Sequence, residues 1–267
     1  MYLPNILKDR YETDPIRHCR YSSRRMFTSA IWFYLRYIIL VICSGIKFFF
    51  AKDPQRTVVR QALLVMRIVE RQGVHLTFEG LSKYPAESGP YVFACNHMST
   101  LEVNVLPGLI ASRIPMTFVV KQSLLKTPFF GKILRRLRAI PVKRCHPGED
   151  LIQVIRVGKK MLSEGTSVIL FPEGTRQDVF SPRRFNSLAV KLALKAEVQI
   201  VPVALKTDFW GAGKLIKEFG ALHRDRRVNI SFGGPIRASG RGKNEQQMIV
   251  DFISNHLREW GSPVDAA

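Results

Sequence analysis

Cysteine is scarce in this sequence, and the few cysteines are not arranged for metal binding. The 267 residues include four of them, Cys19, Cys43, Cys95 and Cys145. None forms a CxxC pair, and no Cys/His cluster has zinc spacing. Cys43 and Cys95 fall within apolar runs, where reduced thiols behave as small hydrophobic side chains. We therefore expect reduced structural thiols in a reducing compartment and no metal site.

Acidic residues are also few, since 21 Asp and Glu stand against 41 Lys and Arg for a formal net charge of +20. Such an excess favours anionic partners, namely nucleic acid, anionic lipid headgroups or phosphorylated small molecules. The sequence lacks a recognised nucleic-acid-reading module and lacks aromatic residues interleaved with basic ones, so we expect no nucleic-acid partner. Hydrophobic residues make up 46% of the chain, enough for a packed core.

The first 25 residues lack an apolar stretch, so we expect no cleavable signal peptide. Residues 26–50 form a long apolar run, and roughly 20 apolar residues suffice to cross a bilayer. Arg36 lies near its middle, where a charge is costly, so a monotopic or re-entrant helix from which Arg36 snorkels is favoured over a full span. A buried core helix of a soluble protein is the remaining alternative. Three aromatic residues are expected to act as interfacial anchors: Trp32, Tyr34 and Tyr37.

A second helix is predicted at residues 57–73, because apolar residues recur there at helical spacing, and Gly73 is expected to end it. One face carries Val58, Ala62, Val65, Met66 and Val69. The two helices predict a hairpin with an apolar side and a basic side, which would anchor the protein to the cytoplasmic face of an anionic membrane. We therefore divide the chain into a membrane-associating segment, residues 1–73, and an α/β domain, residues 74–267.

From residue 74 onward, short apolar runs alternate with helical stretches. The strand candidates are residues 74–80, 90–95, 116–121, 139–144, 166–172, 199–205 and 227–233. The helical stretches are residues 150–164, 186–196 and 245–259. This alternation predicts an α/β fold with a largely parallel sheet of about seven strands flanked by helices. The basic loop around Arg224, Arg226 and Arg227 is interpreted as a solvated loop.

A polar cluster follows the strand at residues 90–95, in the position where α/β folds place their ligands. His97 lies there, and Glu102 lies in the first turn of a helix expected to begin at Ser99. A carboxylate bonded to one imidazole nitrogen fixes the tautomer and favours the cation, as a base that activates an alcohol requires. Ser99 and Glu102 also fit a capping box, which would explain the glutamate without catalysis. A plain hydrogen-bonding loop histidine is a further alternative.

A second cluster, Glu173-Gly174-Thr175-Arg176, follows another apolar strand. Arg176 offers a planar fork that suits phosphate oxygens, and Gly174 lets the backbone approach a bound group closely. We expect Arg176 to face a ligand and Glu173 to brace the loop. Exchanged roles, or a Glu–Arg pair that only braces a tight turn, are the alternatives.

Four motifs in this order resemble the PlsC-type glycerophospholipid acyltransferase family, which includes the 1-acylglycerol-3-phosphate acyltransferases. They are Asn96 to Glu102, the basic strand end Ile140 to Arg144, the FPEGTR run Phe171 to Arg176, and the Val-Pro strand Ile200 to Val203. The resemblance covers roughly residues 74–235. The family commonly carries an N-terminal membrane-associating helical element, which residues 26–73 resemble.

The resemblance implies transfer of a fatty acyl chain from an acyl thioester, either acyl-CoA or acyl carrier protein, to a hydroxyl of a lysophosphatidate-like acceptor. It implies direct attack without an acyl-enzyme, a metal or a cofactor. His97 would be the general base, and the carboxylate of Glu102 would orient it. The implied substrate-binding residues are Arg144, Glu173, Gly174, Thr175, Arg176 and Lys121.

The sequence departs from the family pattern at Glu102, where the family usually has Asp. The extra methylene shifts the carboxylate, and it leaves other acceptors open: another lysolipid, a lyso-aminolipid or glycerol-3-phosphate. A transacylase with a phospholipid donor is a further alternative. The alternative from another class is a non-catalytic basic membrane-binding protein, which only this substitution favours.

Overall fold

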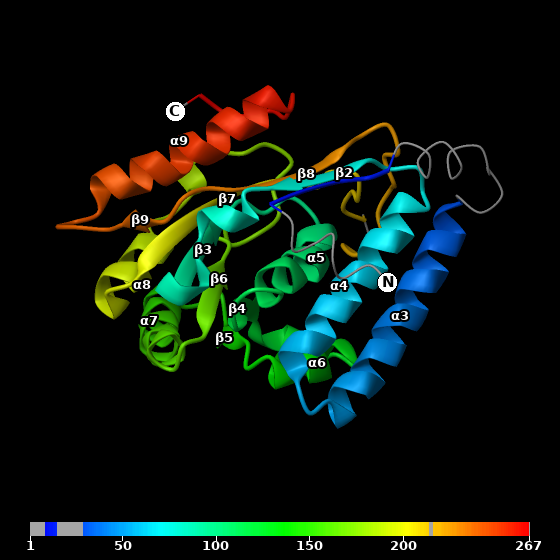
Figure 1. The fold of residues 1–267 in the computed structure, drawn as a ribbon, viewed down its shortest axis with the longest axis horizontal. Coiled ribbons are helices and arrows are strands. Elements are labelled where there is room, and N and C mark those ends of the chain that lie inside the picture. Colours follow the sequence, from blue (N-terminus) through cyan, green and yellow to red (C-terminus); the bar gives the residue numbers. More distant parts are fainter. Residues whose placement is uncertain (1–8, 15–28, 214–215, 267) are drawn as a thin grey trace.

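The computed structural model describes residues 9–14, 29–213 and 216–266, so Cys19 and the start of the apolar run at 26–28 lie outside the described residues. Helices and strands alternate along the described chain (Figure 1). The helices are α3 (Ala30–Phe50), α4 (Pro54–Glu70), α5 (Thr100–Ala111), α6 (Phe130–Arg136), α7 (Pro147–Ser163), α8 (Leu188–Ala196) and α9 (Lys243–Glu259). The strands are β1 (Arg10–Glu12), β2 (Leu76–Glu79), β3 (Tyr91–Cys95), β4 (Met116–Lys121), β5 (Ile140–Val142), β6 (Ser167–Leu170), β7 (Gln199–Lys206), β8 (Val228–Phe232) and β9 (Ile236–Arg237).

The described strands form one sheet in the order β1-β2-β8-β7-β3-β6-β4-β5, with β9 paired to β7. Strands β7, β3, β6, β4 and β5 are parallel to one another, whereas β8 is antiparallel to β7. The predicted α/β fold with a largely parallel sheet is confirmed, and all seven predicted strands are present. The sheet also contains β1 and β9, which are only 3 and 2 residues long, so no hydrophobic period reveals them in the sequence.

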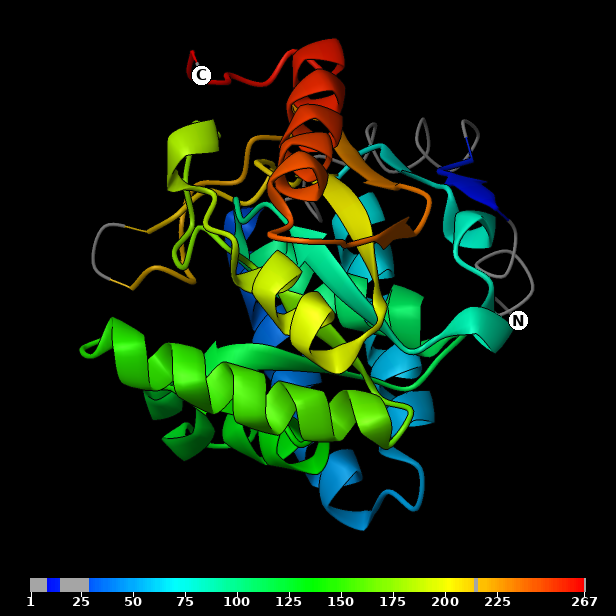
Figure 2. The same cartoon turned by 90° about the vertical axis from the view of Figure 1, so that its left-hand side faces the viewer.

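Helices cover both faces of the sheet, which makes three layers (Figures 1 and 2). Side chains alternate between the two faces along β3. Phe93 and Cys95 join a core cluster with α3, α4, α5 and α6, while Val92 and Ala94 join a second cluster with α7, α8 and α9. Successive side chains of a strand point to opposite faces, so a strand buried on both sides is apolar throughout. That is why β3 reads as one continuous apolar run.

Helix α4 is a core helix, and the prediction that its apolar face meets a membrane is wrong. Its apolar residues are at most 4% exposed: Val58, Ala62, Val65, Met66 and Val69. They pack against α5, which approaches so closely that a Cβ at Gly108 would lie 2.2 Å from the Ala62 Cβ. The helix also starts earlier than predicted, because Asp53 caps it and Pro54 begins it. It ends at Glu70, and Gly73 lies in the following turn at φ +78.

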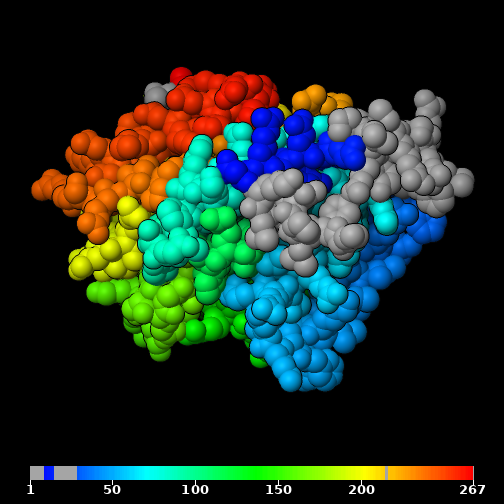
Figure 3. Space-filling view, in the orientation of Figure 1, coloured from blue at the N-terminus to red at the C-terminus, as the bar shows by residue number. Residues whose placement is uncertain are grey.

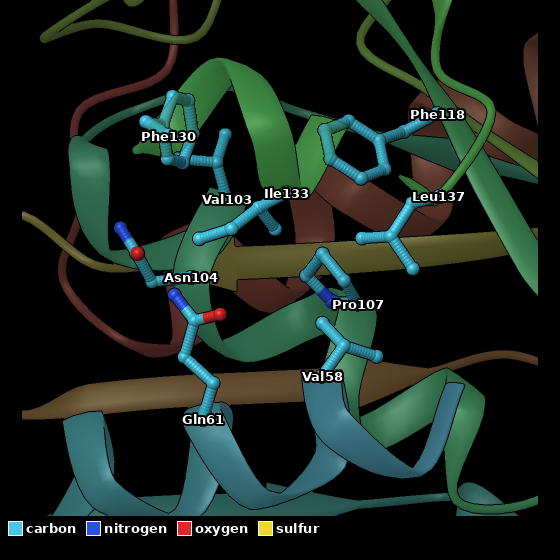
Figure 4. A pocket seen from close by; sticks show the side chains of 9 residues that line it. All are labelled: Val58, Gln61, Val103, Asn104, Pro107, Phe118, Phe130, Ile133 and Leu137. Atoms are coloured by element: carbon cyan, nitrogen blue, oxygen red, sulfur yellow. The ribbon is translucent and has the colours of Figure 1, made fainter. Parts of the chain in front are cut away.

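A small cavity remains where α4, α5, α6 and β4 meet (Figure 4). Its volume is about 10 Å³, which is close to the size of one water molecule. Gln61 of α4 points toward Asn104 of α5 at its edge, and the Gln61 Oε1 atom is buried without a hydrogen-bond partner. The cavity is too small for an acyl chain, so it belongs to the packing of the three helices.

Helix α3 is apolar on two opposite sides, and only one of them meets the protein. Phe33, Tyr37, Leu40 and Phe48 are buried against the core. The opposite side is exposed and carries Ile31, Trp32, Leu35, Ile38, Ile39, Ile42, Ile46, Phe49 and Phe50. By length and composition α3 is the one described helix that could cross a membrane, and its mean hydropathy is 1.7. The turn between α3 and α4 protrudes at the lower edge of the molecule (Figure 3).

Two of the three aromatic residues predicted as interfacial anchors face the protein instead. Tyr37 is 8% exposed and packs edge-on against Trp210, with ring centroids 4.8 Å apart. Tyr34 packs on Trp210 and Phe219, and its hydroxyl donates to the Gly220 carbonyl. The guanidinium of Arg36, which the sequence predicts to snorkel to the membrane interface, is partly buried: its Nη1 is buried with no hydrogen-bond partner among the described residues. The period of an apolar helix does not say which of its faces the protein covers.

The segment that the sequence assigned to a separate N-terminal unit shares its core with the α/β domain. Tyr11 of β1 stacks on Phe78 of β2, with ring centroids 5.1 Å apart, and its hydroxyl donates to Glu70 of α4. Tyr11, Val65 and Phe78 belong to one hydrophobic cluster. The division of the chain between residues 73 and 74 stays a prediction.

Candidate active site

The carboxyl ends of the parallel strands bring the predicted site residues to one edge of the sheet. His97 follows β3, Glu173 follows β6, Lys121 ends β4 and Arg144 follows β5. The strand order places β3 next to β6, so the two motif loops are neighbours although more than seventy residues separate them. On the other side of β3, the end of β7 contributes Thr207 to the same edge.

Asn96 fixes the point at which the chain leaves β3. Its Nδ2 donates to the Leu205 carbonyl at 2.8 Å, and its Oδ1 accepts from the Leu205 N–H at 2.8 Å. Both groups of the amide are therefore used on the backbone of β7, which leaves the amide no rotational freedom. These two hydrogen bonds set the position from which His97 projects.

Glu102 is fully buried and accepts from five groups. Its Oε1 lies 2.8 Å from His97 Nδ1, and it also accepts from the N–H groups of Met98 at 2.6 Å and Ser99 at 2.8 Å. Its Oε2 accepts from Ser99 Oγ at 2.9 Å and from the Thr207 hydroxyl. The capping box is complete as well. The sequence is compatible with either a helix cap or a partner for the histidine, and in the structure one carboxylate makes both interactions.

Several donors keep Glu102 ionised in spite of its burial. Burial by itself raises the pKa of this carboxyl, but the hydrogen bond and charge of His97 and the donors Thr207 and Ser99 outweigh it, so the pKa of Glu102 lies below its ordinary value. A permanent negative charge next to Nδ1 stabilises the imidazolium form of His97. Thr207 was not singled out in the sequence, because it lies 105 residues from Glu102.

His97 is held so that one ring nitrogen remains for a substrate. Its ring stacks on Phe171, with centroids 4.5 Å apart and 30° between the planes, and the residue is 9% exposed. Its backbone N–H donates to Glu173 Oε2 at 2.6 Å, and its carbonyl accepts from the Gln177 N–H at 2.8 Å. Because Nδ1 is engaged by Glu102, Nε2 is the nitrogen that can accept a proton.

Glu173 lies beneath the histidine loop rather than in solvent. Burial is the largest cause that raises its pKa to about 8, and the negative charge of Glu102 adds to the effect. Its Oε1 is buried without a hydrogen-bond partner among the described residues. A carboxyl group that carries its proton suits this environment better than a carboxylate.

The raised pKa of Glu173 predicts a pH-dependent contribution to stability. The unfolded chain loses this proton near the ordinary pKa of 4.5, whereas the folded protein keeps it up to about pH 8. Between these values the folded state binds more protons, so the free energy of unfolding falls as pH rises. Glu173→Gln removes the titration and keeps the acceptor for the His97 N–H. We expect the melting temperature of the wild type to fall relative to the variant across this window. If the melting temperatures of the wild type and the variant change in the same way with pH, Glu173 does not have a raised pKa in the folded protein.

The predicted phosphate-binding residues lie on the side of His97 toward β6, β4 and β5. Gly174 takes a left-handed φ of +72 with open space around its missing Cβ, and Thr175 beside it is exposed. Lys121 is exposed at the end of β4. The Arg144 backbone N–H donates to Asp150 Oδ2 at 2.7 Å, and partial burial together with the charge of Arg176 lowers the Arg144 pKa. The two guanidinium groups are thus near enough to interact.

Arg176, which the sequence predicts to face a ligand, contacts another loop of the protein. Its Nη1 donates to the Lys217 carbonyl at 3.1 Å, and its Nη2 pairs with Glu218 Oε1 at 3.0 Å. Both residues belong to the loop between β7 and β8, which Tyr34 of α3 and Trp210 hold in place. Nothing in the sequence pointed to Glu218. Its carboxylate occupies a position on Arg176 that an anionic ligand would need.

The described residues contain no group of three or more His, Cys, Asp or Glu side chains that could hold a metal ion. The expectation of a metal-independent site stays a prediction.

A buried histidine–carboxylate pair lies beside a cationic loop at the carboxyl edge of a three-layer α/β sheet, and such a pair is chemically able to activate a hydroxyl. The family model described as Acyltransferase matches residues 75–206. A 1-acyl-sn-glycerol-3-phosphate acyltransferase of Bacillus subtilis is 33% identical over 186 residues, covering 68% of this chain and 85% of that protein. The chain belongs to the PlsC-type glycerophospholipid acyltransferase family.

The chain is also similar to a second relative and to a solved structure. A 1-acyl-sn-glycerol-3-phosphate acyltransferase of Pseudomonas aeruginosa is 31% identical over 183 residues, 68% of this chain and 66% of the relative. The match thus spans just under two thirds of that relative's length. The crystal structure of PlsC, a 1-acyl-sn-glycerophosphate acyltransferase from Thermotoga maritima, superposes with a TM-score of 0.66 and 19% identity, covering 92% of this chain and 100% of that one. At this identity the superposition supports the fold alone.

Proposed function

We propose that this protein transfers a fatty acyl chain from an acyl thioester to a hydroxyl group of a lysophosphatidate-like acceptor. One observation carries the proposal: His97 Nδ1 lies 2.8 Å from the Oε1 of a fully buried, ionised Glu102. A histidine held in this way has one free nitrogen and a stabilised cationic form, which is what deprotonation of an alcohol requires. The family relatives support the choice of substrates.

The reaction balances without a covalent enzyme intermediate. His97 Nε2 takes the proton of the acceptor hydroxyl as its oxygen attacks the thioester carbonyl carbon, and a tetrahedral intermediate forms. The carbon–sulfur bond then breaks, and the leaving thiolate takes the proton back from the imidazolium. Glu102 keeps its negative charge throughout and stabilises the imidazolium. No metal or cofactor takes part, and the donor is acyl-CoA or acyl carrier protein.

The decisive assay uses the purified full chain in detergent or liposomes with labelled acyl-CoA and acyl carrier protein donors. Acceptors are lysophosphatidate, glycerol-3-phosphate and lysophospholipids with larger headgroups. Transfer of label to lysophosphatidate at a rate above that of the other acceptors is the expected result. If no acceptor gains label with either donor, the protein is not an acyltransferase of this kind, and a non-catalytic membrane-binding role takes its place.

Arg144 and Arg176 are proposed to bind the acceptor phosphate, on the support of their mutual proximity and their place beside His97. Replacement of either residue by Ala should raise the acceptor KM by about 10-fold to 100-fold with little change in kcat, because a charge-assisted hydrogen bond contributes roughly 1.5–3 kcal/mol. Lys143→Ala is the matched control, since Lys143 is exposed and pairs with Glu149. Unchanged acceptor kinetics in both arginine variants would remove the phosphate assignment.

The exposed apolar side of α3 is proposed to lie in the interface of an anionic membrane on the cytoplasmic side. An exposed surface with nine large apolar side chains on one helix is unusual for a soluble monomer. The buried side of α3 packs on the core along its length, so the helix cannot leave the protein without exposing Phe33 and Phe48. A helix that keeps one side on the protein and the other in lipid supports a monotopic arrangement over a full span.

Substitutions on the exposed side of α3 test the membrane proposal without disturbing the core. Ile39, Ile46 and Phe49 are 51%, 48% and 63% exposed, so serine at all three should leave the melting curve nearly unchanged. Binding to anionic vesicles should fall at least about tenfold, because each large apolar side chain contributes roughly 1.5–3 kcal/mol when fully buried. Ile152→Ser with Met248→Ser is the control, since these exposed apolar residues lie on α7 and α9. Equal vesicle binding by both variants would contradict the proposal.

Removal of residues 1–73 is not a clean test of membrane binding. That truncation deletes α4, whose buried Val65 and Val69 belong to the main core cluster. The remaining chain would expose the surface that α4 covers. A change in its solubility would then report lost folding rather than a lost anchor.

A further inference from the structure

Thr207 lies just after β7 and is turned into the protein. Its neighbours Lys206 and Asp208 line a cleft of about 690 Å³ together with Arg226, whereas Thr207 itself is 0% exposed. Its hydroxyl donates a hydrogen bond to Glu102 Oε2. Because an ionised carboxylate can only accept hydrogen bonds, the Thr207 hydroxyl is the donor. A residue 105 positions away in the chain therefore contacts the carboxylate that holds the proposed base.

The junction between β3 and β7 fixes the distance from Thr207 to the histidine loop. The Asn96 amide binds the N–H and the carbonyl of Leu205 at 2.8 Å each. His97 follows Asn96 directly, and Thr207 stands two residues after Leu205. The two hydrogen bonds that position His97 thus also hold the Thr207 hydroxyl against its loop.

Among the described residues, Thr207 supplies the one donor to Glu102 that comes from another strand. The other four donors are His97 Nδ1, the N–H groups of Met98 and Ser99, and the Ser99 hydroxyl. All four belong to the loop that Glu102 itself caps, so they can move together with it. The Thr207 hydroxyl instead fixes the tilt of the carboxylate relative to the sheet. The orientation of the imidazole on Oε1 depends on that tilt.

The length of the Glu102 side chain makes this contact possible. Glu102→Asp would withdraw the carboxylate by about 1.5 Å, the length of one carbon–carbon bond. An O–H···O hydrogen bond reaches only to about 3.0 Å between the oxygens, so a gap of this size would break the bond to Thr207. The donors of the local loop can follow a shorter side chain, but Thr207 is held by β7 and cannot.

We propose that Thr207 is a positioning residue for acyl transfer, which acts on His97 through Glu102. The proposal rests on the proposed acyltransferase function and extends it to a residue outside the motif loops. Without the hydroxyl, Oε2 would face an apolar group, and the carboxylate would turn toward its remaining donors. The imidazole would lose its fixed orientation, while Arg144 and Arg176 would still be in place for the acceptor phosphate. Loss of the hydroxyl should therefore lower kcat and leave the acceptor KM unchanged.

Three substitutions separate the hydroxyl of Thr207 from its size. Thr207→Ser keeps the hydroxyl and loses a methyl group, Thr207→Val keeps the size and loses the hydroxyl, and Thr207→Ala loses both. The full chain is assayed in detergent with lysophosphatidate and the donor that supports wild-type activity. We expect kcat to fall about tenfold or more in Thr207→Val and Thr207→Ala, and to stay within about threefold of the wild type in Thr207→Ser, because only the first two lose a charge-assisted hydrogen bond.

Thermal unfolding distinguishes this role from a structural one. Thr207→Ser loses a buried methyl group and should melt below the wild type, so a kcat that merely followed stability would fall in this variant too. Thr117→Val is the matched control, because Thr117 is also fully buried and its hydroxyl donates to the Arg138 carbonyl at 3.0 Å, at the amino end of the sheet. It should keep wild-type kcat. Equal kcat in Thr207→Ser and Thr207→Ala would overturn the proposal, and this comparison decides even if Thr207→Val does not fold.

A double-mutant cycle with Glu102→Asp tests whether Thr207 acts through Glu102. Since the shorter side chain already lacks the contact, adding Thr207→Val should lower kcat by less than about twofold in that background. A loss of about tenfold in both backgrounds would show that the two residues act independently, and would overturn the proposal. A wild type that acylates no acceptor would overturn the proposed function as well. A wild type whose activity depends on His97 but not on the Thr207 hydroxyl would overturn the present proposal alone.

Discussion

His97→Ala should abolish acyl transfer and leave the protein folded. A positioned general base contributes about 10²–10⁴-fold to a reaction, so kcat should fall by at least two orders of magnitude. The acceptor KM should change little, because the proposed phosphate-binding residues follow other strands. The proton of the acceptor hydroxyl would have no group in reach to receive it.

The fold should survive this substitution because the carboxylate beneath the ring keeps its other donors. Without the imidazole, Glu102 still accepts from the N–H groups of Met98 and Ser99 and from the hydroxyls of Ser99 and Thr207. The stacking of the ring on Phe171 is lost, so a modest fall in melting temperature is expected. His146→Ala, which removes an exposed imidazole, should keep full activity. A folded His97→Ala protein with wild-type turnover would rule out His97 as the general base.

Glu102→Gln should lose most of the activity and some stability. The amide cannot stabilise an imidazolium as a carboxylate does, so the gain from the base falls and kcat should drop by about 10²-fold or more. In addition, the amide NH₂ of the glutamine takes the place of a carboxylate oxygen that accepts hydrogen bonds, so one donor would face another donor. The hydroxyls of Ser99 and Thr207 can rotate to accept from it, so the expected loss of stability is about 1–3 kcal/mol rather than complete unfolding. This is a larger loss than a simple helix cap predicts.

Turnover at saturating acceptor and thermal unfolding together distinguish the roles of Glu102. Glu245→Gln is the matched control, because Glu245 also lies in the first turn of a helix, where it accepts from the N–H and hydroxyl of Ser239. Glu102→Asp keeps the charge but shortens the reach, so partial activity is expected. If Glu102→Gln turns over like the wild type, Glu102 is only a cap and another group orients His97.

Local chemistry explains why the His97–Glu102 pair could be predicted from the sequence. Five residues separate them, and a helix N-terminus at Ser99 returns the carboxylate to the strand tip whatever the rest of the fold does. Two of the other donors to that carboxylate show the limit of such reasoning. The Met98 N–H is local and follows from the cap, but the Thr207 hydroxyl comes from β7, and no period or spacing connects it to Glu102.

The helical hairpin of α3 and α4 also shows which features local sequence can predict and which depend on packing. The sequence correctly predicted two apolar helices, because hydrophobic period depends only on the order of residues. It assigned the apolar face of α4 to a membrane, and that face turned out to be buried under α5, with Gly108 allowing the close approach. Burial of apolar surface is favourable against protein and lipid alike, so a period cannot identify the partner.

Four features could be predicted without the structure: the α/β class, the seven main strands, the motif loops at their carboxyl ends and the pairing of His97 with Glu102. Each of these depends on residues that are neighbours in the chain or on a repeat along it. Three features became visible only in the folded protein: the ion pair of Glu218 with Arg176, the cleft beside His97 that Asp208 and Arg226 line, and the uncovered side of α3. These features depend on contacts between segments distant in sequence, and such contacts are set by how the layers pack rather than by any local preference.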